Sequence, residues 1–173
     1  MKNIVLIGPS GVGKTTIGKY ISSKLKIEQV DTDFIIEKKF SMSIENIFKK
    51  YGENWFRIEE SNIVKEVSNK NNIVISTGGG VVINEKNIEN LKSTGILFML
   101  VGSIDTLTRN LMNSNKKRPL IGNYGYDEIY KNVKNMFFER EKLYIKSADY
   151  LISVDNRTIE EIGEEIISFY KKH

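Results

Sequence analysis

The residues with the clearest chemistry form the segment Gly8-Pro-Ser-Gly-Val-Gly-Lys-Thr15, which matches the pattern G-x-x-x-x-G-K-[ST]. A predicted strand ends just before it and a predicted helix, Lys14 to about Leu25, begins inside it, which is the context the pattern requires. The glycines let consecutive N–H groups point at phosphate oxygens, and the helix N-terminus adds a positive dipole. Lys14 would reach the transferred phosphate, and the Thr15 hydroxyl would ligate Mg²⁺. The pattern therefore predicts a nucleoside triphosphate site.

A pair of carboxylates, Asp31 and Asp33, follows the second predicted strand. If this segment is extended, residues two apart point to the same side, so one carboxylate could face Mg²⁺ and the other an acceptor. Asp33 could also be the N-cap of a helix from Phe34 onward. A GTPase is disfavoured, because the Asn-Lys-x-Asp element of guanine-specific switches is missing from the chain.

Two further features suit a small anionic ligand. Three glycines, Gly78 to Gly80, follow the third predicted strand, at the sheet edge where ligands bind in open parallel sheets. Only five of the 26 basic residues are arginines, and a planar guanidinium grips a carboxylate or phosphate with two parallel hydrogen bonds. These five are Arg57, Arg109, Arg118, Arg140 and Arg157. A chance scatter of arginines is the alternative interpretation, and Arg109 and Arg157 could be ordinary solvated residues.

Strands and helices alternate along the chain, which predicts an α/β fold with a parallel sheet covered by helices on both faces. The predicted strands are Lys2–Ile7, Ile27–Val30, Asn72–Ser76, Gly95–Val101 and Tyr150–Val154. Besides the helix at Lys14, we expect one that opens at Ser43, one from about Asn54 to Asn69, and a last one with apolar residues at helical spacing between Ile159 and Tyr170. The polar segment 113–125 is either an exposed loop or a mobile lid.

Length and composition exclude several classes of protein. A chain of 173 residues, 40% hydrophobic and 28% charged, fits one domain, residues 1–173. It has no cysteine and one histidine, His173, which excludes a disulfide scaffold, a thiolate zinc site and a histidine base. Its apolar runs are shorter than a membrane span, and its N-terminus lacks a signal-peptide cleavage site. We therefore expect a cytoplasmic protein that does not bind a membrane. The net charge of +4 comes from dispersed lysines and does not predict nucleic-acid binding.

The chain resembles the shikimate kinases over nearly its whole length. The P-loop alone is generic, but the resemblance also includes Asp31-Thr-Asp33, Gly52-Glu53, Phe56-Arg57-Ile-Glu-Glu60, Gly78-Gly-Gly80, Arg118-Pro-Leu120 and Arg140-Glu-Lys-Leu-Tyr144. A minor departure is Lys142, where the family often has proline. The resemblance implies transfer of the ATP γ-phosphoryl group to the 3-hydroxyl of shikimate, a step toward aromatic amino acids. It also implies a P-loop fold with strand order 2-3-1-4-5, a shikimate-binding region at about 32–62, a lid at about 113–125, Mg²⁺ as the metal, and a monomer.

The resemblance further assigns roles residue by residue. The residues implied for ATP are Gly11, Val12, Gly13, Lys14, Thr15, Thr16, Arg109, Arg118 and Arg157, with the two arginines Arg109 and Arg157 on either side of adenine. Those implied for shikimate are Asp33, Arg57, Glu60, Gly78, Gly79, Gly80 and Arg140, with Arg57 and Arg140 on the carboxylate. Glu60 would hold Arg57 or contact the substrate through water. Thr15 and Asp31 are implied for the metal, and Asp33, Lys14 and Arg118 for catalysis.

Two other functions are compatible with the P-loop. The first is a gluconate or nucleotide kinase, although a nucleotide acceptor would need a base pocket and phosphate clamps. The second is a nucleotide-binding regulatory or nucleic-acid module, against which the dispersed lysines and the complete set of acceptor residues count. A panel of acceptors in an ADP-release assay separates these possibilities.

Overall fold

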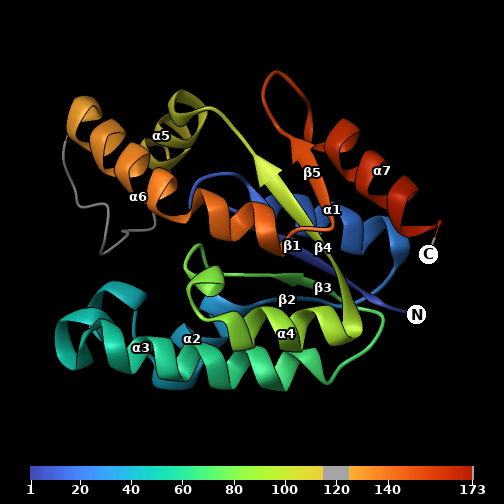
Figure 1. The fold of residues 1–173 in the computed structure, drawn as a ribbon, viewed down its shortest axis with the longest axis horizontal. Coiled ribbons are helices and arrows are strands. Elements are labelled where there is room, and N and C mark those ends of the chain that lie inside the picture. The colour runs from blue at the N-terminus through green and yellow to red at the C-terminus, as the bar shows by residue number, and fades with distance from the viewer. Residues whose placement is uncertain (115–124, 173) are drawn as a thin grey trace.

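The five strands form one all-parallel sheet in the order β2-β3-β1-β4-β5 (Figure 1). The computed structural model describes residues 1–114 and 125–172. The strands are β1 Asn3–Ile7, β2 Gln29–Asp31, β3 Val74–Ser76, β4 Gly95–Val101 and β5 Tyr150–Ser153. The predicted fold class, strand order and five strands are therefore confirmed. The predicted second and third strands began two residues too early, because pairing between β2 and β3 starts only where Gln29 faces Val74.

Helices lie between consecutive strands, and one more helix follows the last strand. They are α1 Lys14–Leu25, α2 Thr32–Phe40, α3 Ile44–Ser68, α4 Glu85–Thr94, α5 Ile104–Met112, α6 Tyr126–Ser147 and α7 Ile159–Tyr170, with a short 3₁₀ turn, η1, at Val81–Ile83. The predicted cap at Ser43 is confirmed, because its side chain accepts a hydrogen bond from the Asn46 N–H. The last helix begins with a capping box between Thr158 and Glu161.

Helix α3 contains the two helices that the sequence predicts, joined by a kink. Gly52 has φ 82° and ψ 169°, which lies outside the helical region and is open mainly to glycine. The second segment begins directly after this residue, and its first turns carry Glu53 and Arg57. The kink therefore sets the direction from which these two side chains reach the sheet edge.

Each face of the sheet carries its own apolar core. Side chains alternate along β1 and β4, so Ile4, Leu6 and Phe98 lie on one face while Val5, Ile7 and Leu97 lie on the other. Helices α1, α5 and α7 cover the first face, and α2, α3 and α4 cover the second (Figure 1). Helix α6 contributes to both cores, with Ile129 and Val133 in the first and Tyr144 in the second. The candidate site lies at the carboxyl ends of the central strands.

The predicted lid at about 113–125 and its Arg118 fall almost entirely on residues outside the described part of the chain. Their roles stay predictions. The same holds for the assignment of a single domain and of a shikimate-binding region at about 32–62.

Candidate active site

The phosphate loop has the backbone that its glycines permit. Gly8, Gly11 and Gly13 all have positive φ, and Gly13, at 98°, is the N-cap of α1. The Lys14 ammonium is buried under the loop and donates to the carbonyls of Gly8, at 2.7 Å, and Pro9, at 2.9 Å. A cation and a helix N-terminus therefore face the same small space, which favours an anion there.

The two carboxylates after β2 have different local structures. Asp31 ends β2 and is the N-cap of α2: its Oδ1 accepts from the Phe34 N–H at 3.1 Å, and its Oδ2 accepts from the Thr15 hydroxyl at 2.6 Å. Asp33 lies in the first turn of α2. The extended geometry predicted for this segment is therefore wrong, and so is the alternative of Asp33 as the cap, because the Asp31 side chain already starts the helix. Both carboxylates still line the same cleft.

The triple glycine forms a tight loop between β3 and η1. The Gly78 N–H donates to the Thr32 hydroxyl at 3.1 Å, and the carbonyls of Gly78 and Gly80 accept from Val81 and Ile83. A Cβ at Gly78 would lie 2.6 Å from the Asp33 carboxylate, and one at Gly80 would lie 2.1 Å from Nη1 of Arg57. Glycine is required here because these side chains rest directly on the backbone. The loop thereby brings Asp33 and Arg57 to one place.

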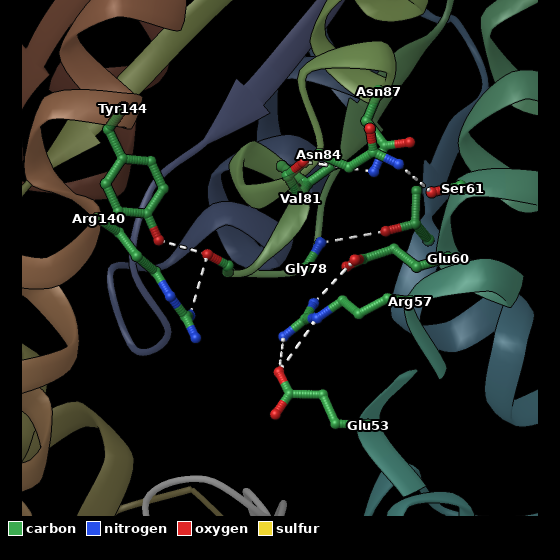
Figure 2. A network of polar contacts seen from close by, with 12 residues as sticks. Glu53, Arg57, Glu60, Ser61, Gly78, Val81, Asn84, Asn87, Arg140 and Tyr144 are labelled. Carbon is green, nitrogen blue, oxygen red and sulfur yellow. Dashed lines mark hydrogen bonds and ion pairs between the residues drawn. The ribbon is translucent and has the colours of Figure 1, made fainter. Parts of the chain in front are cut away.

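Arg57 is held between two carboxylates on its own helix. Its Nη1 donates to Glu60 at 2.8 Å, while its Nε and Nη2 donate to Glu53 at 3.3 and 3.1 Å (Figure 2). The spacings of three and four residues place all three side chains on one face of α3. The guanidinium is consequently oriented before any ligand arrives.

Glu60 is a buried carboxylate with only 1% of its surface exposed. Its Oε2 takes the bond from Arg57, and its Oε1 has no hydrogen-bond partner among the described residues. Burial raises the pKa of Glu60, and this effect outweighs the opposing attraction of Arg57. The structure thus places Glu60 beside Arg57.

A second arginine approaches the glycine loop from the opposite side. Arg140 and Tyr144, on α6, both donate to the Gly79 carbonyl, Arg140 through Nη1 at 3.5 Å. Figure 2 shows the guanidinium groups of Arg57 and Arg140 pointing into the same space below the glycine loop, one from α3 and one from α6. Two convergent guanidiniums suit a small carboxylate.

A cleft of about 820 Å³ joins the phosphate loop to this region. Its lining includes Gly11, Val12, Gly13, Lys14, Thr15, Thr16, Asp31, Asp33, Gly79 and Arg157. Arg157 is fixed there by bonds to the Ser153 carbonyl at 3.0 Å and to Glu165 at 2.5 Å. Arg109 lies on α5 beside the cleft, is largely exposed and faces Asp105 at 3.9 Å. Of the two arginines predicted to flank adenine, Arg157 lines the cleft, whereas Arg109 is absent from its lining.

Two residues of the site, Glu53 and Tyr144, had no predicted role, although both belong to motifs that carry the family resemblance. Glu53 follows the kink and accepts hydrogen bonds from one edge of the Arg57 guanidinium. Tyr144 donates a hydrogen bond to the Gly79 carbonyl of the glycine loop. Spacing was the available signal, because Glu53 precedes Arg57 by four residues and Tyr144 follows Arg140 by four, which is the separation of neighbours on a helix.

Comparison with known proteins agrees with this geometry. The shikimate kinase family profile matches residues 10–171. The chain belongs to the shikimate kinase family. It is 42% identical over 172 residues to the shikimate kinase of Caldanaerobacter subterraneus subsp. tengcongensis, covering 99% of this chain and 98% of that one.

Solved structures of the family share the fold over the whole chain. A shikimate kinase from Acinetobacter baumannii in complex with shikimate superposes with a TM-score of 0.92 at 30% identity, covering 99% of this chain and 94% of that one. The enzyme from Bacteroides thetaiotaomicron gives 0.90 at 31% identity, with 98% of each chain covered. The family similarity and the fold therefore extend over nearly the whole chain.

Proposed function

We propose that this protein transfers the γ-phosphoryl group of ATP to the 3-hydroxyl of shikimate, giving shikimate 3-phosphate and ADP. The observation that carries the proposal is the convergence of Arg57 and Arg140, from two different helices, on the glycine loop beside a P-loop cleft. A site of this kind suits a small ring with one carboxylate. The phosphate groups of ATP need neither guanidinium, because the P-loop supplies the hydrogen-bond donors for them.

The acceptor is held by groups from three helices, α2, α3 and α6, and from the glycine loop. The guanidiniums of Arg57 and Arg140 bind its carboxylate, with Glu60 keeping Arg57 in place. Asp33 accepts hydrogen bonds from the ring hydroxyls, and the Gly79 and Gly80 N–H groups donate to the acceptor. Asp33 and Gly79 also line the ATP cleft, so the acceptor hydroxyl lies at the end of that cleft where the γ-phosphate arrives.

Thr15 and Asp31 fit the Mg²⁺ that accompanies ATP. The hydroxyl and the carboxylate are hydrogen-bonded to each other at the cleft wall, and both are the oxygen ligands that Mg²⁺ prefers. Among the described residues no group of three acidic or histidine side chains is able to hold a metal by itself. This favours a cation bound by ATP phosphates with one or two protein oxygens. When bound, Mg²⁺ neutralises charge on the phosphates.

The chain's own residues then position the reacting groups. When ATP binds, the Lys14 ammonium gives up its hydrogen bonds to the Gly8 and Pro9 carbonyls and donates to phosphate oxygens instead. There it stabilises the negative charge that develops on these oxygens during transfer. Asp33 orients the attacking hydroxyl and accepts its proton. Because phosphoryl transfer has a loose transition state, the orientation of the hydroxyl contributes to the rate alongside the acceptance of its proton. Arg118, outside the described residues, is proposed to stabilise charge in the transition state.

We propose a cytoplasmic monomer that binds only small molecules. In the part of the chain that the structure describes, every helix is too short or too polar to cross a bilayer.

Arg140→Lys tests the acceptor assignment. Lysine keeps the charge but loses the two-pronged geometry, so the KM for shikimate should rise by about 30-fold, or about 2 kcal/mol, while the KM for ATP changes little. Arg109→Lys is the matched control, because it makes the same exchange at a position proposed for adenine. Steady-state kinetics with each substrate varied measures both. Equal loss of ATP binding in Arg140→Lys would contradict the assignment.

A further inference from the structure

The Gly79 carbonyl receives two donors from one helix. The Tyr144 hydroxyl makes the closer bond, and Arg140 Nη1 approaches the same oxygen at 3.5 Å (Figure 2). The four-residue spacing puts both side chains on one face of α6. Arg140 has a proposed role as a carboxylate ligand, whereas Tyr144 has none.

The surroundings of Tyr144 keep its hydroxyl protonated. The side chain is 1% exposed. Burial raises the pKa of Tyr144 to about 12, so the hydroxyl keeps its proton over the working range of an enzyme. It therefore cannot serve as the base of the reaction. Its proton is donated to the Gly79 carbonyl, while the neighbouring Arg140 acts against burial and lowers the pKa.

Holding the Gly79 carbonyl also fixes the Gly80 N–H, which lies on the acceptor side of the glycine loop. The described peptide bonds are all trans, so the Gly79 C=O and the Gly80 N–H lie in one plane and point in opposite directions. Gly80 is also the residue on which the Arg57 guanidinium rests, since a Cβ there would stand 2.1 Å from Nη1. Rotation of this peptide would move both the Gly80 donor and the surface that supports Arg57.

We propose that Tyr144 is a positioning residue for shikimate: by holding the Gly79 carbonyl it fixes the Gly79–Gly80 peptide, and through it the Gly80 N–H and the place of Arg57. This rests on the proposed function, in which Gly80, Arg57 and Arg140 bind the acceptor. Tyr144 touches no reacting atom, so it sets the affinity for the acceptor and leaves the chemical step unchanged.

Tyr144→Phe tests the proposal, with Tyr170→Phe as the matched control. Tyr170 is also a buried tyrosine that donates to a backbone carbonyl, that of Lys2 at 2.7 Å. It lies on α7, however, and lines neither the cleft at the phosphate loop nor the small cavity that Tyr144 shares with Arg140. We expect Tyr144→Phe to raise the KM for shikimate about 5-fold, the loss of one neutral hydrogen bond. Its kcat should stay within about twofold, and its KM for ATP should not change. Tyr170→Phe should leave all three values at wild type, and both variants should lose similar thermal stability.

Each other outcome overturns the proposal. An unchanged KM for shikimate in Tyr144→Phe means that Arg140 alone holds the carbonyl. A fall in kcat with an unchanged KM would place Tyr144 in the chemical step. A melting temperature far below that of Tyr170→Phe, or loss of folding, would make the role structural. If Arg140→Lys also leaves the KM for shikimate unchanged, the acceptor site itself is misplaced, which separates that failure from a failure of Tyr144 alone.

Discussion

Asp31 and Asp33 are two residues apart, yet the structure gives them different tasks. Asp31 is fixed twice, by the Thr15 hydroxyl and by the Phe34 N–H, and so has little freedom to follow a substrate. Asp33 lies in the first turn of α2, against Gly78 of the glycine loop. The sequence predicted that both carboxylates face the cleft. It did not predict the backbone conformation between them, because an Asp-Thr-Asp segment is compatible with a strand end and with a helix start.

Asp33→Asn should lower kcat by about two to four decades while ATP binding is retained. The amide keeps the shape and one acceptor oxygen but cannot take a proton, and this range is usual for the loss of a general base. Asp31→Asn is the matched change, and its defect should appear as a raised Mg²⁺ requirement. Kinetics across Mg²⁺ concentrations separates the two. Turnover near wild type in Asp33→Asn would leave Asp33 a binding residue at most.

Glu60 should make the folded protein less stable as the pH rises. Its pKa is raised by burial in the folded state, so the folded protein binds a proton that the unfolded chain releases above its ordinary value of 4.5. The contribution of Glu60 to the unfolding free energy is therefore fully present below pH 4.5 and is lost as the pH rises through the raised pKa.

Denaturant unfolding of wild type and Glu60→Gln at several pH values measures this contribution. The difference, wild type minus variant, should fall as the pH increases from 4.5 toward neutrality. Glu66→Gln is the control, because Glu66 is an exposed carboxylate on the same helix. It measures how the loss of a surface charge alone changes the unfolding free energy. A difference that grows with pH would mean that the attraction of Arg57 outweighs burial.

At the scale of elements, the kink in α3 shows what sequence patterns resolve and what they leave open. Ser43 and the run from Asn54 predicted two helices, and both exist, but nothing in the apolar spacing predicted that they would abut at a single residue. Similarly, the strands were predicted within about two residues, whereas the exact starts of β2 and β3 depend on pairing with a partner far away in the sequence. Local pattern fixes the type of element, and tertiary contacts fix its ends.

Gly52→Ala should destabilise the fold by about 1–3 kcal/mol, because alanine is strained at φ 82° and ψ 169°. For a domain of this size, each kcal/mol corresponds to about 2–4 °C in Tm. Gly125→Ala is the matched control: an added Cβ meets nothing within 4 Å at either glycine, but Gly125 has φ −64°. Thermal unfolding of both variants checks this. Equal Tm values would show that the kink relaxes at no cost.

At the scale of the whole molecule, the sheet order brings together residues from distant parts of the chain. The P-loop follows β1, Asp31 ends β2 and the triple glycine follows β3, and these three strands are neighbours in the order β2-β3-β1. Their meeting at one edge was predictable from the alternation of strands and helices. The approach of α6, which brings Arg140 and Tyr144 to the Gly79 carbonyl, was not, because the direction of a long helix after a loop depends on packing against both cores.

The most direct test of the central claim is ADP release by the purified protein with ATP, Mg²⁺ and a panel of acceptors: shikimate, its methyl ester, gluconate and AMP. The paired guanidiniums of Arg57 and Arg140 predict turnover with shikimate and a kcat/KM for the uncharged ester lower by about two decades, as the loss of a charged contact at each arginine implies. Gluconate and AMP should give no turnover above the ATPase background. Absence of turnover with shikimate, or equal turnover with shikimate and its ester, would contradict the account.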